Sequence, residues 1–297
     1  MSTLAIGAWL GTSWSPDEVV TVGREVEAAG YDGIWLADHF MNNTGTEERS
    51  GSRNLEVFGL LAGLATTVPR VRLGSLVASM TYRHPAVLAN IAATVDGLSG
   101  GRLVLGVGTG WQLNEHAAYG LPLGPPRERI DRFVEGLDVL TGLLRDDSTT
   151  VDGEYYTVSD APRVVAADAP RTPLLIGASG ERRMLGVVAR YADEWNCWST
   201  PELFAHKSAV LDEHCARVGR DPRTIRRSTQ AIIDIDGEGL GPGSAVVSGS
   251  VAEIVDVIGR WREAGLDELI VPGIRGTADQ ARRLFDRIMG EIVPQLV

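Results

Sequence analysis

The sequence has few cysteines and no cluster of basic residues, and each shortage excludes a class of protein. Its two cysteines, Cys197 and Cys215, lie outside any metal-ligand spacing, so we expect neither a disulfide framework nor a zinc module. Lys and Arg total 28 against 39 Asp and Glu, a formal net charge of -11, which repels nucleic acid and anionic membranes. No apolar run approaches the roughly 18 residues of a membrane helix. We therefore expect a cytoplasmic protein that binds neither nucleic acid nor membranes.

Short apolar runs alternate with amphipathic stretches along the whole chain, which is the pattern of repeated βα units around a parallel sheet. The apolar runs predict strands at 4–8, 33–37, 71–77, 103–107, 174–177, 194–198, 225–235 and 269–272. The amphipathic stretches predict helices at 16–29, 55–67, 85–98, 127–144, 182–191, 201–218, 251–264 and 278–292. Eight βα units close a (β/α)8 TIM barrel. We expect this α/β fold, with an insertion at 149–173 after strand four, as a single domain over 1–297.

Ligands of such a barrel bind at the carboxyl ends of its strands, so the residues that follow each strand are the candidates. Asp38 and His39 follow the second strand. Histidine exchanges protons near neutral pH, and an adjacent carboxylate can orient it or accept an N–H from a cofactor. An equally good interpretation from these residues alone is that Asp38 caps the next segment and His39 fills a polar rim.

Two further junctions are rich in glycine. Gly108, Gly110 and Trp111 follow the fourth strand, where glycine lets the backbone approach a ligand and the indole could stack on a ring or simply pack at the rim. The spacing does not fit a dinucleotide fingerprint, which we reject. The segment 177–182 joins the fifth strand to a helix start, so its N–H groups form either a phosphate site or an ordinary turn.

The junction at 74–80, after the third strand, carries no acid or base and suits either the face of an aromatic ring or a core strand. Two histidines in one predicted helix, His206 and His214, are eight residues apart, which is the wrong spacing for the metal pair of a zincin. We expect no metal site.

Several of these segments together resemble the bacterial-luciferase-like family of flavin-dependent oxidoreductases, and more narrowly its coenzyme F-420 (deazaflavin) branch. The matching segments are 28–40, 72–77, 82–86, 98–102, 108–111, 173–182 and 191–196. The most specific are Leu-Ser-Gly-Gly-Arg at 98–102 and Tyr-Ala-Asp-Glu-Trp-Asn at 191–196. The resemblance covers nearly the whole chain and implies a barrel that holds a flavin or deazaflavin ring across its strand ends.

The resemblance also implies roles for individual residues. Asp38 and His39 would lie beside the ring, and Leu76 and Val77 would form a bulge, often with a non-prolyl cis peptide, behind it. Hydrogen bonds to the ring and its side chain would come from Ser79, Thr109, Gly110 and Asn114. The phosphate would be held by Gly177, Ala178, Ser179, Gly180 and Glu181.

One position departs from the pattern of the branch. Its sugar-phosphate dehydrogenases resemble this chain but carry an acidic glutamate where Trp111 stands, so we do not expect sugar-phosphate oxidation and assign Trp111 to the substrate pocket. His39 then remains as the proton donor or acceptor. We expect an oxidoreductase that transfers a hydride between coenzyme F-420 (8-hydroxy-5-deazaflavin) and a small organic substrate.

Two alternatives stay open from the sequence. The first is an FMN-dependent two-component monooxygenase that receives reduced flavin from a separate flavin reductase; an F-420 reductase would be the corresponding partner of the favoured function. The second is a non-catalytic flavin-binding carrier or sensor. A homodimer is expected only by analogy with the family.

Overall fold

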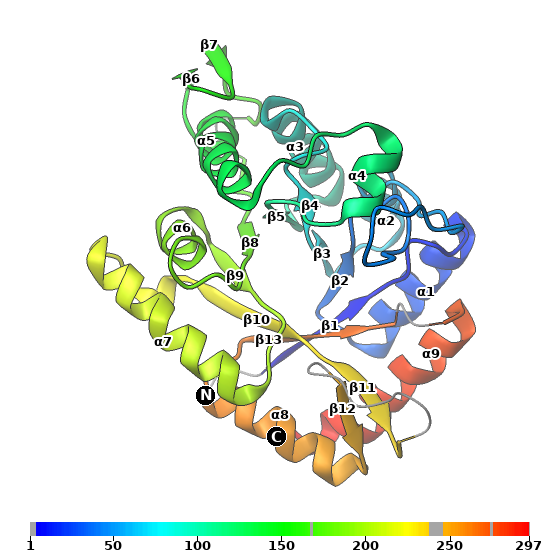
Figure 1. Cartoon of the computed structure of the whole chain (residues 1–297). Coiled ribbons are helices and arrows are strands. Elements are labelled where there is room, and N and C mark those ends of the chain that lie inside the picture. The colour runs from blue at the N-terminus through cyan, green and yellow to red at the C-terminus, as the bar shows by residue number, and fades with distance from the viewer. Residues whose placement is uncertain (1–3, 167–168, 238–245, 274–275, 297) are drawn as a thin grey trace.

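The computed structural model describes residues 4–166, 169–237, 246–273 and 276–296, in which helices surround a closed ring of parallel strands (Figure 1). The strands follow the order β3-β2-β1-β13-β10-β9-β8-β5-β4, and a pairing between β3 and β5 closes the ring. Because β3 and β4 are two parts of one interrupted strand, the ring has eight positions. The predicted (β/α)8 TIM barrel is confirmed.

The elements of the barrel alternate along the chain as predicted. Its strands are β1 (Ala5–Trp9), β2 (Gly33–Leu36), β3 (Arg72–Ser75), β4 (Ala78–Ser79), β5 (Leu103–Gly108), β8 (Leu174–Gly177), β9 (Glu194–Asn196), β10 (Arg226–Gln230) and β13 (Glu268–Pro272). Its outer helices are α1 (Pro16–Ala29), α2 (Val57–Thr67), α3 (Pro85–Ser99), α5 (Pro126–Arg145), α6 (Met184–Tyr191), α7 (Pro201–Arg217), α8 (Val251–Glu263) and α9 (Ala278–Arg287).

Local signals explain where several of the helices begin and end. Ser15 and Ser250 each form a capping box with a glutamate three residues later, which satisfies backbone N–H groups at the starts of α1 and α8. Gly30 ends α1 with φ 95°, in the left-handed region that glycine reaches without a steric cost.

The insertion after the fourth barrel strand is present. The stretch expected at 149–173 forms an antiparallel hairpin of β6 (Ser148–Asp152) and β7 (Thr157–Pro162), and a short helix, α4 (Leu113–Tyr119), lies between β5 and α5. Figure 1 shows this hairpin beyond α5, away from the ring. Residues 167–168 of the predicted insertion lie outside the described residues.

Several elements differ from the prediction. The strand expected at 71–77 is interrupted after Ser75 and resumes as β4. The expected strand at 225–235 is two strands, because after Gln230 the chain leaves the ring and β11 (Ile232–Ile235) pairs with β12 (Val246–Gly249) in a separate sheet. Both halves are largely buried, so the apolar run does not reveal the break. Helix α4 was missed because no side chain caps its start. The helix expected at 278–292 is α-helical to Arg287 and π-helical over Ile288–Ile292.

The interior of the barrel is built around one large side chain, the indole of Trp35. Glycines on the neighbouring strands make room for it: a Cβ at Gly74 would overlap the indole ring, and one at Gly7 would lie 2.7 Å from its Nε1. Trp35 packs in a cluster with Leu76, Val104 and other interior residues, whereas its neighbours Ile34 and Leu36 belong to the layer between strands and helices. The side chains of β2 thus alternate between two buried faces.

A charged layer closes the amino-terminal end of the barrel. Arg72, Glu194, Arg226 and Glu268 are the first residues of β3, β9, β10 and β13. Glu268 accepts from Trp35 Nε1 at 2.8 Å and pairs with Arg72 at 2.9 Å and Arg226 at 3.3 Å, while Arg72 also pairs with Glu194. Buried charges persist only when they are paired in this way.

Among the described residues, no helix is both long and apolar enough to cross a membrane.

The packing of Trp35 against Gly74 gives a direct test of the interior. Gly74→Ala is expected to lower the free energy of unfolding by about 1–3 kcal/mol, because the added methyl group overpacks a filled site. The matched control is Gly97→Ala in α3, where a Cβ meets nothing within 4 Å and helix propensity predicts a gain of about 0.5–1 kcal/mol. Urea unfolding measures both. Equal midpoints for Gly74→Ala and the wild type would contradict this account of the barrel interior.

Candidate active site

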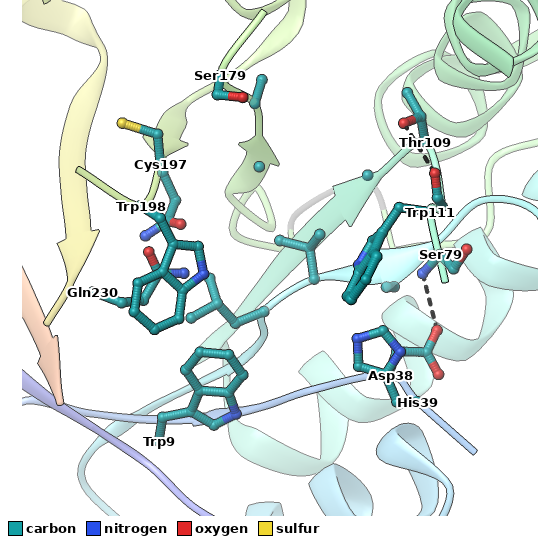
Figure 2. A pocket seen from close by; sticks show the side chains of 18 of the residues that line it. Trp9, Asp38, His39, Ser79, Thr109, Trp111, Ser179, Cys197, Trp198 and Gln230 are labelled. Atoms are coloured by element: carbon teal, nitrogen blue, oxygen red, sulfur yellow. Dashed lines mark hydrogen bonds between the residues drawn. The ribbon is translucent and has the colours of Figure 1, made fainter. Parts of the chain in front are cut away.

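A cavity of about 380 Å³ opens at the carboxyl ends of the barrel strands, opposite the charged layer. Its lining comes from the ends of β1, β2, β4, β5, β8, β9 and β10, and Figure 2 shows these side chains facing a common space. The lining residues are Trp9, Asp38, His39, Leu76, Val77, Ala78, Ser79, Tyr82, Gly108, Thr109, Gly110, Trp111, Gly177, Ala178, Ser179, Asn196, Cys197, Trp198 and Gln230.

Asp38 is a buried carboxylate whose oxygens are engaged by the protein itself. Arg83 donates to both of its oxygens, at 2.6 and 3.0 Å, and Ser79 N donates to Oδ2 at 3.0 Å. Such a bidentate pair is strong and geometrically fixed. Asp38 therefore ties the end of β2 to β4, and its charge is compensated before any ligand arrives.

His39 is held by a second buried carboxylate, Glu115 of α4. The distance between His39 Nδ1 and Glu115 Oε1 is 2.7 Å, and Glu115 Oε2 accepts from Phe40 N at 2.8 Å. Tyr82 also donates its hydroxyl to Glu115. Since an ionised carboxylate only accepts, Nδ1 carries the proton in the neutral imidazole and Nε2 is left with a lone pair. Within the described residues Nε2 has no partner, so it is free to exchange a proton with a ligand.

Glu115 is ionised although it is fully buried. Burial opposes ionisation, but hydrogen bonds from His39, Tyr82 and Phe40 outweigh it and hold the pKa of Glu115 below its ordinary value. The pKa of Tyr82 is raised in turn, first by burial and then by its hydrogen bond to the charged Glu115. Tyr82 therefore stays protonated and acts as a fixed donor.

The floor of the cavity is apolar and lies where the third barrel strand is interrupted. The peptide bond between Leu76 and Val77 is cis, as the resemblance implied. A Cβ at Gly108 would lie 2.8 Å from Val77 Cγ2, and one at Gly177 would lie 3.1 Å from Val77 Cγ1. Glycine at these two positions lets the Val77 side chain lie between β5 and β8.

Ser79 belongs to a chain of hydrogen bonds that leads away from the cavity. Ser79 Oγ lies 2.7 Å from Thr81 Oγ1, which lies 2.7 Å from His116 Nε2, and His116 Nδ1 lies 2.6 Å from Gln112 O. A carbonyl oxygen only accepts, so Nδ1 donates and neutral His116 accepts through Nε2 from Thr81. The Ser79 hydroxyl then donates to Thr81, and its oxygen presents lone pairs toward the cavity.

The segment expected to hold a phosphate is only partly at the cavity. Gly177, Ala178 and Ser179 line it, whereas Gly180 and Glu181 do not. Lys207, whose side chain is 10 % exposed, donates to Ser179 O at 2.7 Å and pairs with Glu181 at 3.0 Å. This pair holds the segment against α7.

Most of the predicted site residues meet at this cavity, but not all of them do. Asp38, His39, Leu76, Val77, Ser79, Thr109, Gly110, Trp111, Gly177, Ala178 and Ser179 line it. Asn114 is a buried residue of α4, and its side-chain amide donates to Asn42 O at 2.8 Å. Trp111 is 56 % exposed and contacts His39 edge-on, with ring centroids 5.5 Å apart.

The sequence did not reveal one wall of the cavity or the partner of His39. Trp9, Asn196 and Gln230 are the last residues of β1, β9 and β10, and Trp198 follows β9 by two residues. None of these strand ends carries a glycine-rich junction. Glu115 lies four residues after Trp111 in a stretch expected to be a loop, so nothing in the pattern directed it toward His39. Trp9 directly follows the strand expected at 4–8, and this position at a strand end was the only sign that it could line the cavity.

Four of the described lining side chains are titratable, and among these four His39 is suited to proton exchange. Asp38 is paired with Arg83, and Tyr82 donates to Glu115. Burial raises the pKa of the Cys197 thiol to about 11, so it stays neutral. No group of three or more His, Cys, Asp or Glu residues within the described ranges is arranged to hold a metal ion.

The cavity fits a flat aromatic cofactor ring. Its floor is Leu76 and Val77, and polar groups of Ser79, Thr109 and Gly110 stand at one edge. Figure 2 shows Ser79 and Thr109 on that side of the cavity. Apolar surfaces with a few fixed polar groups at the edges are typical of cofactor pockets.

Known proteins share this architecture. A solved coenzyme F-420-dependent tetrahydromethanopterin reductase from Methanopyrus kandleri superposes with a TM-score of 0.82 and 18% identity over 100% of both chains, a likeness of fold. An F-420-dependent glucose-6-phosphate dehydrogenase from Beutenbergia cavernae is 34% identical over 71% of this chain and 61% of its own length. A pyrimidine monooxygenase, RutA, from Escherichia coli is 33% identical over 57% of this chain and 47% of its own length.

The matched region therefore spans about 61% of the length of a curated F-420-dependent relative. A model of the luciferase-like monooxygenase family matches residues 1–236, which is most of the sequence. The chain belongs to the luciferase-like monooxygenase family.

Proposed function

We propose that this protein is an oxidoreductase that transfers a hydride between coenzyme F-420 and a small organic substrate. One observation carries the proposal: His39, held through Nδ1 by the buried Glu115, lines a cavity whose floor and polar edge suit a flat ring, and its Nε2 has no partner among the described residues. The F-420-dependent relatives support the choice of cofactor over FMN.

The residues of this chain have separate tasks in that reaction. When bound, the deazaflavin supplies the hydride acceptor or donor. His39 Nε2 accepts the hydroxyl proton when an alcohol carbon loses its hydride, and returns a proton to the carbonyl oxygen in the reverse direction. Glu115 keeps Nδ1 protonated and stabilises the imidazolium that forms, as a buried carboxylate does in other His–carboxylate pairs.

The remaining site residues position the ring in this proposal. Leu76 and Val77 support its face, and Ser79, Thr109 and Gly110 bind its edge, with Asp38 acting through its hold on Ser79 N. Gly177, Ala178 and Ser179 take the phosphate, while Gly180 and Glu181 shape that segment through Lys207. We give Asn114 no contact with the ring, since it donates to Asn42 O.

Cellular context is also part of the proposal. We place the protein in the cytoplasm as a single domain, with a small-molecule substrate, a separate reductase that renews the cofactor, and a homodimer as in its family. Two free, buried cysteines support a reducing compartment, and the net charge of -11 opposes nucleic-acid binding.

Cofactor titration tests the function. The purified protein is expected to bind coenzyme F-420, measured by quenching of cofactor fluorescence, and to reduce it with at least one member of a panel of alcohols, measured by the visible absorption of the cofactor. Tight binding of FMN without F-420 would favour the monooxygenase alternative. Binding without turnover by any substrate would favour the carrier or sensor.

Replacing His39 tests the proton carrier. His39→Ala is expected to leave the cofactor dissociation constant nearly unchanged and to slow turnover by about 100-fold or more, the size of a general acid–base contribution. Steady-state kinetics at saturating F-420 measure the effect. Turnover equal to that of the wild type would remove His39 from the mechanism.

Glu115→Gln tests the carboxylate that orients His39. Turnover is expected to fall by roughly 100-fold, because the neutral amide no longer stabilises the charged imidazole. The exposed Glu213→Gln in α7 is the control and should behave as the wild type. Ionised Glu115 has a pKa below its ordinary value of 4.5. Its contribution to stability is therefore present above about pH 4.5 and is lost as the pH falls through the folded-state pKa.

Acid unfolding followed by circular dichroism measures this second effect. The wild type should lose stability below about pH 4.5 more steeply than Glu115→Gln, which has no carboxylate to protonate. Parallel acid unfolding curves would contradict an ionised Glu115.

A further inference from the structure

One wall of the cavity is made by two tryptophans and two amides, and none of the roles proposed above involves it. This tryptophan–amide wall consists of Trp9, Asn196, Trp198 and Gln230, from the ends of β1, β9 and β10. Figure 2 shows it across the cavity from Asp38, Ser79 and Thr109. Trp9 and Trp198 contact each other, with ring centroids 5.9 Å apart and planes at 47°.

The wall contains polar atoms that no described residue satisfies. Gln230 is 4 % exposed and its Oε1 has no hydrogen-bond partner, and the same holds for the buried Nε1 of Trp9. Asn196 donates from Nδ2 to Ser228 Oγ at 2.9 Å, which fixes the amide, and no described residue donates to its Oδ1. Buried side-chain polar atoms are normally paired. Unpaired acceptors beside a cavity therefore indicate a donor supplied by a ligand.

The charges of the residues around the wall indicate which chemical groups of a ligand could bind there. No lysine or arginine is among the described residues that line the cavity. Cys197, next to the wall, is held as a neutral thiol by its burial. Among these described residues a phosphate or carboxylate would find no cation, and the unpaired Oε1 of Gln230 calls for an O–H or N–H donor. The half-exposed indole of Trp198 offers a face for a flat ring.

We propose that the tryptophan–amide wall binds the edge of a flat ring that bears a hydroxyl group, with the hydroxyl donating to Gln230 Oε1 and the ring packed on Trp198. This inference rests on the proposed function and deepens it. Two molecules carry the required chemistry. One is the deazaflavin, which has a hydroxyl on its outer ring where FMN has a methyl group, and the other is a hydroxylated ring of the substrate.

Gln230→Met tests the hydroxyl contact, because methionine has a similar length and lacks the amide. Dissociation constants are measured for F-420 and FMN with the apoprotein. Fluorine NMR then measures 4-fluorophenol and 4-fluorotoluene with the cofactor-loaded protein. Gln295→Met, an exposed glutamine near the carboxyl terminus, is the matched control and should leave all four constants unchanged.

The outcomes separate the two sources. Weaker F-420 binding by about tenfold, with FMN binding unchanged, assigns the wall to the cofactor ring; tenfold is the size expected for one hydrogen bond to a buried partner. Unchanged cofactor binding with about tenfold weaker 4-fluorophenol, and no change for 4-fluorotoluene, assigns it to the substrate. If Gln230→Met alters none of the four constants, the inference is overturned.

Trp198→Leu provides a second test that does not disturb the buried amides. Because Trp198 is 39 % exposed, its replacement should preserve the fold, and circular dichroism checks this. We expect weaker binding of the ring that occupies the wall, with or without its hydroxyl. Unchanged binding of every ring would overturn the packing on Trp198. A wild-type protein that binds neither cofactor would instead contradict the proposed function, whatever the variants show.

Discussion

The barrel depends on how the indole of Trp35 is accommodated inside a ring of parallel strands. An indole is too large for an interior layer of branched aliphatic residues, so its own strand presents Gly33 and the neighbouring strands present Gly7 and Gly74 toward it. Its N–H would be unsatisfied there, and Glu268 accepts it. That carboxylate in turn requires cations, which Arg72 and Arg226 supply. One bulky residue thus determines a glycine-lined space, a buried carboxylate and a charged layer at the amino-terminal end.

Because the charged layer lies at the amino-terminal end of the barrel, the carboxyl-terminal end can form an apolar ligand pocket. The charges are confined to the first residues of the strands. The interior between this charged layer and the cavity is an apolar cluster that ends at Leu76 and Val77. Charged groups return only at the rim, where each is compensated locally: Asp38 by Arg83, and Glu115 by hydrogen bonds from His39, Tyr82 and Phe40. Electrostatic preorganisation of this kind places a reactive group without leaving an unpaired charge in the pocket.

The repeat of βα units could be predicted from the sequence because each buried strand is a short apolar run and each helix is amphipathic. The break between β10 and β11 could not be predicted, because the residues on both sides of Ala231 are buried. A pattern of apolar residues indicates which residues are buried, but not where the chain turns out of the ring. Site residues were predictable where a strand ends in an unusual local pattern, as at Asp38–His39 or Gly108–Trp111. Glu115, Trp9 and Gln230 act through tertiary proximity alone, and no local pattern marks a residue that becomes important only when distant elements meet.

The compensation of charges around the cavity also limits which reactions the site can support. A proton can leave a substrate only toward a group with a free lone pair and a suitable pKa. Asp38 is committed to Arg83 and Ser79 N, the pKa of Tyr82 is raised by burial and by Glu115, and Cys197 is a neutral thiol. His39 Nε2 remains, on a ring whose other nitrogen is fixed by Glu115. With one proton carrier and an apolar floor, the cavity suits the proposed hydride transfer, because the interconversion of an alcohol and a carbonyl moves a single proton with each hydride.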